Sequence, residues 1–192
     1  GNDKAAGRLS VSYHRYGGGY DGNGDEVLID NPQTGLQYSD RIDVMGTGTI
    51  NMDDHQQLQL TTQYYKSESD GKHGLFLGEN FSAVTGDAKA YNKDNLNSDR
   101  IPGTERHLIN LQYSNTDFWG QDLVAQIYYR DESLTYYPFP TLSKGAVTSI
   151  GASQQKTDFY GGKLTLNSKP VDDLTLTWGV DADHEAVDGN QQ

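Results

Sequence analysis

The stretch DRIDVMGTGTI at residues 40–50 is followed by a polar turn and then by QLQLTTQYYK at residues 57–66. In the first run Ile42 and Val44 alternate with charged residues, and in the second Leu58 and Leu60 alternate with glutamines. A period of two is the signature of a β-strand with one apolar face. The short turn at residues 51–56 predicts that the two strands pair as an antiparallel hairpin.

The same alternation recurs along most of the chain. Each segment is close to the ~9–11 residues that a tilted strand needs to cross a bilayer. The polar faces are rich in Gln, Thr, Asn and Ser, which suits a wet, hydrogen-bonding lumen. The sequence predicts strands at residues 8–14, 41–50, 57–65, 107–114, 122–130, 159–167 and 174–183.

The connections between these segments alternate in length. The turns at residues 115–121 and 168–172 are short, whereas residues 67–103 form a long loop. Short turns at one end, long loops at the other and aromatic residues near strand ends are typical of a transmembrane β-barrel. The expected aromatic girdle comprises Tyr64, Tyr113, Trp119, Tyr128, Tyr129 and Tyr160.

Composition excludes several other classes of protein. The 192 residues carry a formal net charge of −12, which disfavours nucleic acid as a partner. Cysteine is absent, so no disulfide or thiolate metal site is predicted. The chain begins Gly-Asn-Asp and ends Gly-Asn-Gln-Gln, and we interpret both ends as cuts in a longer protein. A sheet of seven strands cannot close into an even-numbered barrel, so further strands are expected to complete it.

The segment YYRDESLTYYPFPT at residues 128–141 is the main candidate for ligand binding. It combines five aromatic residues with a cation on the polar face, an arrangement suited to a large anionic or metal-chelate ligand. Because the chain is acidic, an anionic ligand requires locally focused positive charge. An aromatic girdle with loop packing explains the same segment equally well. The candidate ligand-binding residues are Arg130, Lys163, Tyr128, Tyr136, Tyr137 and Phe139.

Three other clusters have simpler explanations. The spacing of Asp21, Asn23 and Asp25 resembles the start of a calcium loop, but the rest of that pattern is missing and a Gly/Asp turn is expected. We interpret the acidic run 181–185 around His184 as a solvated strand end. The charges at Asp99, Arg100, Glu105 and Arg106 are expected to pair as loop scaffolding. The histidines show no metal-ligand spacing and no catalytic motif is present, so neither an enzyme, a resident metal nor a cofactor is predicted.

Several runs together resemble the TonB-dependent outer-membrane siderophore receptors. They are TGLQYSDRIDVMGTGTIN (34–51), LNSDRIPGTERHLI (96–109), YYRDESL (128–134), YPFPT (137–141), KLTLNSKP (163–170) and TWGVDADHE (177–185).

The resemblance implies a large antiparallel barrel of about 22 strands around an N-terminal plug domain. Residues 1–192 would form the N-terminal part of that barrel, with about seven strands, and the plug has no counterpart in this sequence. The implied ligand is a ferric siderophore of the hydroxamate type, whose iron is cargo. The implied partners are the TonB complex, reached through the plug region, and outer-membrane lipid.

Two other functions stay open on the pattern of residues alone. A passive, porin-like outer-membrane barrel shares every feature of the strands. A soluble β-protein that binds glycans through Tyr and Trp would show the same alternation.

Overall fold

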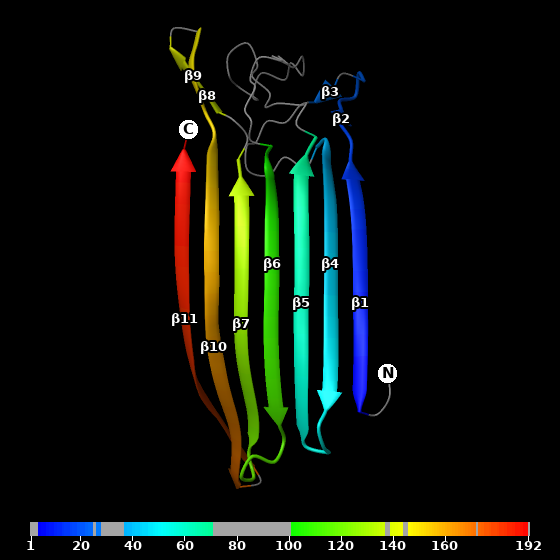
Figure 1. Cartoon of the computed structure of the whole chain (residues 1–192), viewed down its shortest axis with the longest axis vertical. Helices are drawn as coiled ribbons and strands as arrows, with labels where there is room; N and C mark the ends of the chain where they lie inside the picture. The colour runs from blue at the N-terminus through cyan, green and yellow to red at the C-terminus, as the bar shows by residue number, and fades with distance from the viewer. Residues whose placement is uncertain are drawn as a thin grey trace.

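In a computed structural model the chain is one long antiparallel sheet (Figure 1). The structure describes residues 4–24, 26–27, 37–70, 101–136, 139–143, 146–171 and 173–191. Seven strands make up the main sheet in the order β1-β4-β5-β6-β7-β10-β11, and two small hairpins, β2-β3 and β8-β9, lie outside it. No helix among the described residues is long and apolar enough to cross a membrane.

All seven predicted strands are present, and each is longer than its alternation indicated. The strands of the main sheet are β1 (Ala5–Tyr16), β4 (Ser39–Asn51), β5 (Gln56–Ser69), β6 (Gly103–Asn115), β7 (Asp122–Thr135), β10 (Ser153–Val171) and β11 (Leu174–Gln191). The small hairpins are β2 (Gly19–Tyr20) with β3 (Glu26–Val27), and β8 (Phe139–Ser143) with β9 (Ala146–Gly151).

The strand register aligns the apolar positions of every strand on one side of the sheet. Leu60 of β5 pairs with Leu111 of β6, which pairs with Ile127 of β7. We call this side the apolar face. It comprises Leu9, Val11, Ile42, Val44, Leu58, Leu60, Tyr64, Ile109, Leu111, Tyr113, Leu123, Ile127, Tyr129, Tyr160, Leu164, Leu166, Trp178 and Val180, together with their neighbours in register.

The apolar face has no second layer over it in the described part of the chain. Leu9 is 72% exposed, Ile127 61% and Val180 65%. Figure 1 shows a single curved layer of strands. A soluble sandwich would bury such a face against a second sheet about 10 Å away, so the described fold disagrees with that alternative.

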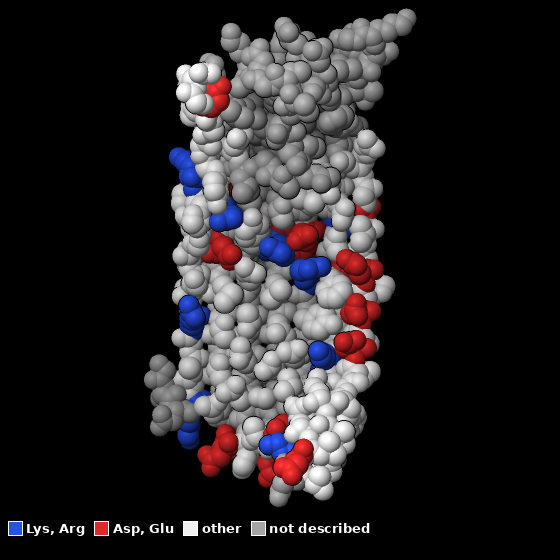
Figure 2. Space-filling view, turned by 180° about the vertical axis from the view of Figure 1, so that it is seen from behind, with Lys and Arg blue, Asp and Glu red and all other residues white. Residues whose placement is uncertain are grey.

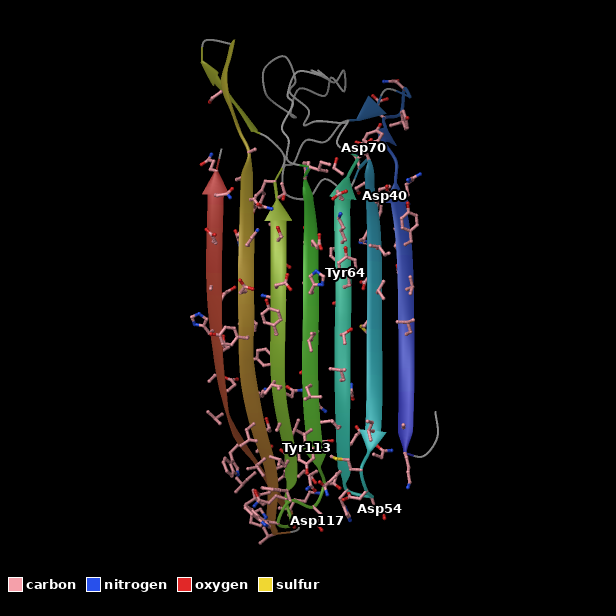
Figure 3. The ribbon with its side chains drawn as sticks, in the orientation of Figure 1. Asp40, Asp54, Tyr64, Asp70, Tyr113 and Asp117 are labelled. Atoms are coloured by element: carbon pink, nitrogen blue, oxygen red, sulfur yellow. The ribbon has the colours of Figure 1, made fainter. Side chains whose placement is uncertain are left out.

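Aromatic and charged side chains mark the two ends of the apolar face. Figure 3 shows Tyr64 toward the long-loop end and Tyr113 toward the short-turn end. Asp40 and Asp70 lie beyond Tyr64, and Asp54 lies beyond Tyr113. Four of the expected girdle residues, Tyr64, Tyr113, Tyr129 and Tyr160, do lie on this face. Tyr128 was misassigned to the girdle, because its register places it opposite Asn110 and Gly161 on the other side.

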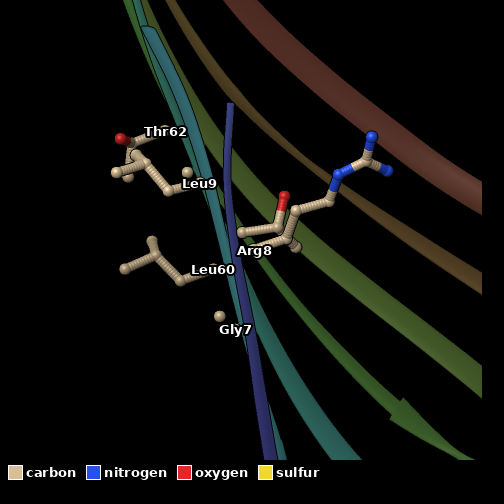
Figure 4. A pocket seen from close by; sticks show the side chains of 8 residues that line it. Gly7, Arg8, Leu9, Leu60 and Thr62 are labelled. Atoms are coloured by element: carbon tan, nitrogen blue, oxygen red, sulfur yellow. The ribbon is translucent and has the colours of Figure 1, made fainter. Parts of the chain in front are cut away.

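The apolar face is hollowed where small residues meet. Gly7 pairs with Gly48, and Gly46 lies between Leu9 and Thr62. The hollow has a volume of about 470 Å³. In Figure 4, Leu9, Leu60 and Thr62 stand on one side of the sheet, whereas Arg8 points to the other.

The turn between β6 and β7 is a tight two-residue hairpin. Phe118 and Gln121 exchange backbone hydrogen bonds of 2.8 and 3.2 Å. Trp119 and Gly120 between them have φ angles of 55° and 75°, as a type I′ turn requires. Such a turn matches the right-handed twist of the strands that it joins. The exposed Trp119 ring packs against Phe118 at 4.4 Å between centroids.

The turn between β4 and β5 is held by one carboxylate. The backbone N–H groups of His55 and Gln56 donate to Asp53 Oδ1 at 2.9 and 2.7 Å. These hydrogen bonds, that from His55 first, lower the pKa of the Asp53 carboxyl below its ordinary value. The ionised carboxylate therefore stabilises this turn.

We expect this stabilisation to be lost in acid. Because the folded-state pKa is lowered, the contribution is complete above the unfolded pKa of about 3.9 and disappears as the pH falls through the lower folded value. Asp53→Asn keeps an acceptor oxygen but does not titrate here, whereas Asp53→Ala removes the acceptor. We would measure the unfolding midpoint between pH 7 and 3 for a receptor carrying this chain and for its Asp53→Asn variant. The difference between the two midpoints should depend on pH. Identical pH profiles for the unsubstituted receptor and Asp53→Asn would contradict this role.

Candidate functional site

The side of the sheet opposite the apolar face carries the polar positions of all seven strands. We call it the polar face. Figure 2, which views the sheet from behind, shows basic and acidic side chains in a band across it. Toward the short-turn end this face also carries amide side chains, and Gln126 Nε2 donates to Gln112 Oε1 at 2.6 Å.

Three arginines on the polar face each lie over an aromatic ring. The Arg41 guanidinium is 5.4 Å from the centroid of Tyr16, that of Arg106 is 5.2 Å from Tyr65, and that of Arg130 is 5.2 Å from Phe159. We call these six residues the arginine–aromatic belt. It crosses the sheet from β1 to β10, near the end where the long loops emerge. Stacking over a ring is a favourable arrangement for a guanidinium.

Acidic side chains share the polar face with the belt, and Glu185 and Asp183 of β11 pair in register with Phe159 and Gly161 of β10. Arg106 Nη1 lies 3.6 Å from Glu132 Oε2, and both side chains are about one-third exposed. Asp43 accepts two hydrogen bonds from Gln63 Nε2, at 3.0 and 3.1 Å. Within the described ranges Arg41 and Arg130 form no ion pair. The belt therefore brings three cations together within an acidic chain.

The structure brings together two of the predicted ligand residues. Tyr128 stacks on Phe159 at 5.6 Å between centroids, and Arg130 lies over the same ring. Lys163 is exposed on the same face, between Gln126 and Asp181 in register. Whether any of these residues contacts a ligand remains a prediction.

The other predicted ligand residues lie at the edge of the described structure. Tyr136 is half-buried just after β7, and its backbone N–H donates to Ser153 O at 3.0 Å. Phe139 begins β8, although its side chain is outside the described set. Tyr137 lies outside the described residues.

Two predicted clusters are divided by the alternation of the strands. Glu105 and Arg106 lie in β6 and not in a loop, and they point to opposite faces, so the expected loop scaffolding was wrong for them. Glu105 contacts His107 at 3.4 Å instead. Asp99 and Arg100 lie outside the described residues.

The acidic run of β11 is divided in the same way. Asp181, Asp183 and Glu185 lie on the polar face. His184 is on the opposite face, with its ring 5.2 Å from Tyr160.

The expected Gly/Asp turn is confirmed where it is described. Asn23 N–H donates to Asp21 Oδ1 at 2.8 Å, and Gly24 N–H donates to Asp21 O at 3.1 Å. Asp25 lies outside the described residues. Across the described ranges, no three or more His, Asp or Glu side chains gather as a metal site.

Sequence reasoning missed most of the belt. Arg106, Tyr65, Phe159 and Arg41 were not among the candidate residues. Alternation did place Arg41, Tyr65 and Phe159 on the polar face, but the pairs depend on the register between neighbouring strands. One signal in the sequence could have indicated the belt: an arginine on one predicted strand and an aromatic residue at the same distance from the strand end on its neighbour.

The fold defines a wall of alternating strands, with an apolar surface on one side and a charged, polar surface on the other. Sequence comparison indicates the class of protein to which this wall is similar, because the chain matches siderophore receptors over all or nearly all of its length. No protein-family model matches the chain, and no solved structure matches it.

The most similar proteins found include two ferric aerobactin receptors. The chain is 62% identical over 192 residues to that of Klebsiella pneumoniae and 60% identical over 192 residues to that of Escherichia coli. It is 34% identical over 185 residues to the rhizobactin receptor of Rhizobium meliloti. The chain spans about a quarter of the length of these relatives, between 25% and 26%. The predicted resemblance to siderophore receptors is thereby confirmed.

Proposed function

We propose that this chain forms part of the wall of an outer-membrane receptor for a ferric siderophore of the aerobactin-like hydroxamate type. The observation that carries the proposal is the 62% identity to a ferric aerobactin receptor over every residue of the chain. The relatives are named as receptors and not as enzymes, and we assign no catalytic role. In this proposal residues 1–192 are a partial barrel domain, the iron is cargo, and no resident cofactor is needed.

The exposed apolar face supports a membrane location. The strands β4 to β7 contain 13 or 14 residues each, enough to cross a bilayer at a tilt. In the described sheet β1 and β11 are the edge strands, and backbone groups left unpaired on such edges in lipid would cost several kcal/mol each unless further strands pair with them. A closed barrel of about 22 strands would provide those partners.

The polar face supports a role in ligand passage. With the apolar face against outer-membrane lipid, the arginine–aromatic belt lines the inside of the barrel, in the half that faces the long extracellular loops. In this arrangement Arg130, Lys163 and Tyr128 border the route of the ligand and Tyr136 lies toward its mouth, and we keep Tyr137 and Phe139 as candidate contacts. We propose that transport is energised by TonB through a plug domain and involves no nucleic acid.

A chimaeric receptor tests this function directly. The matching quarter of the Escherichia coli ferric aerobactin receptor is replaced by this chain and expressed in a strain that lacks its own receptor. With ferric aerobactin as the sole iron source, we expect growth that depends on TonB. The unmodified receptor and an empty vector are the controls.

Two outcomes would contradict the proposal. Absence of growth, although the chimaera is folded in the outer membrane, would exclude this chain from aerobactin uptake. Growth that persists in a strain lacking TonB would favour the passive, porin-like channel.

A further inference from the structure

The two central arginines of the belt lie close to one another on neighbouring strands. Arg106 on β6 is opposite Glu132 in register, and Arg130 on β7 is opposite Leu108. They are therefore diagonal neighbours across one strand pair, a separation of about 7–8 Å between positions. Within 4 Å of these two cations the described residues provide one carboxylate, that of Glu132 at 3.6 Å from Arg106, while Glu185 of β11 pairs in register with Phe159.

Each guanidinium lies over an aromatic ring and has a donor without a partner among the described residues. The rings of Tyr65 and Phe159 lie under Arg106 and Arg130 at 5.2 Å. The Nε atoms of both arginines are buried without a hydrogen-bond partner among the described residues. The Nη groups are the remaining donors of each side chain. A buried donor without a partner is costly, so this arrangement is poorly explained by stability.

The remaining donors match a planar anion. A guanidinium presents its N–H groups in a rigid fork that fits a carboxylate, and a ring-stacked guanidinium is already oriented for it. Its position in the long-loop half of the polar face places this fork where a ligand enters from outside, if the proposed function holds. An acidic chain can attract an anion only where its cations are focused.

We propose that Arg106 and Arg130, supported by Tyr65 and Phe159, form a carboxylate-binding subsite for the organic part of the ferric siderophore. Arg130 provides the principal contact, because it has no ion pair in the described structure. Arg106 shares its charge with Glu132 and binds the carboxylate more weakly. The inference rests on the proposed function but concerns which chemical group of the ligand is recognised.

The test combines changes in the receptor with a change in the ligand. The chimaeric receptor that carries this chain is prepared as Arg130→Gln, Arg130→Lys and Arg106→Gln. Equilibrium binding of radioactive-iron-labelled ferric aerobactin is measured on outer-membrane vesicles. The same measurement uses ferric aerobactin whose peripheral carboxylates are converted to carboxamides. Arg8→Gln is the matched control, since Arg8 lies on the same face outside the belt.

We expect Arg130→Gln to weaken binding of the acid by about 10–100-fold, the range for losing charge-assisted hydrogen bonds. Arg106→Gln should weaken it less. The carboxamide form of ferric aerobactin should bind the unsubstituted chimaera weakly. Its affinity should fall little further in the Arg130→Gln variant. Arg130→Lys should also weaken binding, because lysine keeps the charge but lacks the fork. Arg8→Gln should bind as the unsubstituted protein does.

Several outcomes would overturn the inference. If Arg130→Gln weakened binding of ferric aerobactin and of its carboxamide form equally, Arg130 would not recognise a carboxylate. It would then support the structure of the receptor, for example by contacting another segment of the same protein. Unchanged affinity of Arg130→Gln or Arg130→Lys for ferric aerobactin would show that the guanidinium group of Arg130 does not recognise the ligand. Failure of the unsubstituted chimaera to bind ferric aerobactin would instead reject the proposed function. A heat-modifiable electrophoretic mobility shows that each variant is folded.

Discussion

Replacing Ile127 by arginine should destabilise a receptor carrying this chain by about 2–4 kcal/mol, the cost of a cation at the lipid-facing midplane of a barrel. Ile127 is 61% exposed on the apolar face, midway along β7. Its neighbours in register are Leu111 and Gly162, and neither offers a counter-charge. In water such a surface substitution would change the free energy of unfolding by no more than about 0.5 kcal/mol.

Thr61→Arg is the matched control for Ile127→Arg. Thr61 lies on the polar face at a similar depth, between Thr47 and Asn110 in register. An arginine there faces an aqueous lumen and should leave stability nearly unchanged. The measurement is urea unfolding of the chimaeric receptor in lipid vesicles, followed by tryptophan fluorescence. If Ile127→Arg proved as mild as Thr61→Arg, the apolar face would not face lipid.

Adding one methyl group at Gly161 should destabilise the sheet by about 1–3 kcal/mol, the usual cost of overpacking. A Cβ built on Gly161 of β10 would lie 2.7 Å from Ala182 O, 2.8 Å from the Tyr128 hydroxyl and 2.9 Å from Asp183 Cβ. The backbone contact cannot move away without disturbing the pairing of β10 with β11. The Tyr128 ring would also be displaced from its stacking on Phe159.

Gly48→Ala provides the comparison for Gly161→Ala. A Cβ at Gly48 would meet no atom within 4 Å, because this glycine borders the hollow in the apolar face. Gly48→Ala should be neutral or stabilising by up to about 1 kcal/mol. Unfolding measured as above should separate the two variants, and equal effects would show that the close contacts at Gly161 do not constrain the sheet.

The strands and their faces could be predicted from sequence because a period of two is a local signal. Val11, Leu60 and Ile127 each alternate with polar neighbours, so each residue's face follows from its own strand. The ends of the strands were less accessible. β10 begins already at Ser153 and β11 continues to Gln191. Many residues in these extensions are polar, and they pair through backbone hydrogen bonds without the alternation of apolar and polar residues that marks a strand in the sequence.

The arginine–aromatic belt could be predicted only in part. Arg130 stood out because aromatic residues surround it in sequence. Arg106 contacts Tyr65 from another strand, and these two residues meet only once the register of β5 against β6 is fixed. Conversely, residues that are adjacent in sequence need not be neighbours in space. Glu105 and Arg106 lie on opposite faces of the sheet.

The order of strands in the sheet has a consequence for how the wall is assembled. Each strand of the main sheet pairs with the one that precedes it in the chain, apart from the small hairpins that branch from the loops. No strand must be threaded between two that are already paired. The sheet can therefore form one hairpin at a time, starting from its tight turns. The entropic cost of loop closure is then small at each of those steps. During insertion, only the newest strand then carries an open edge on the growing side.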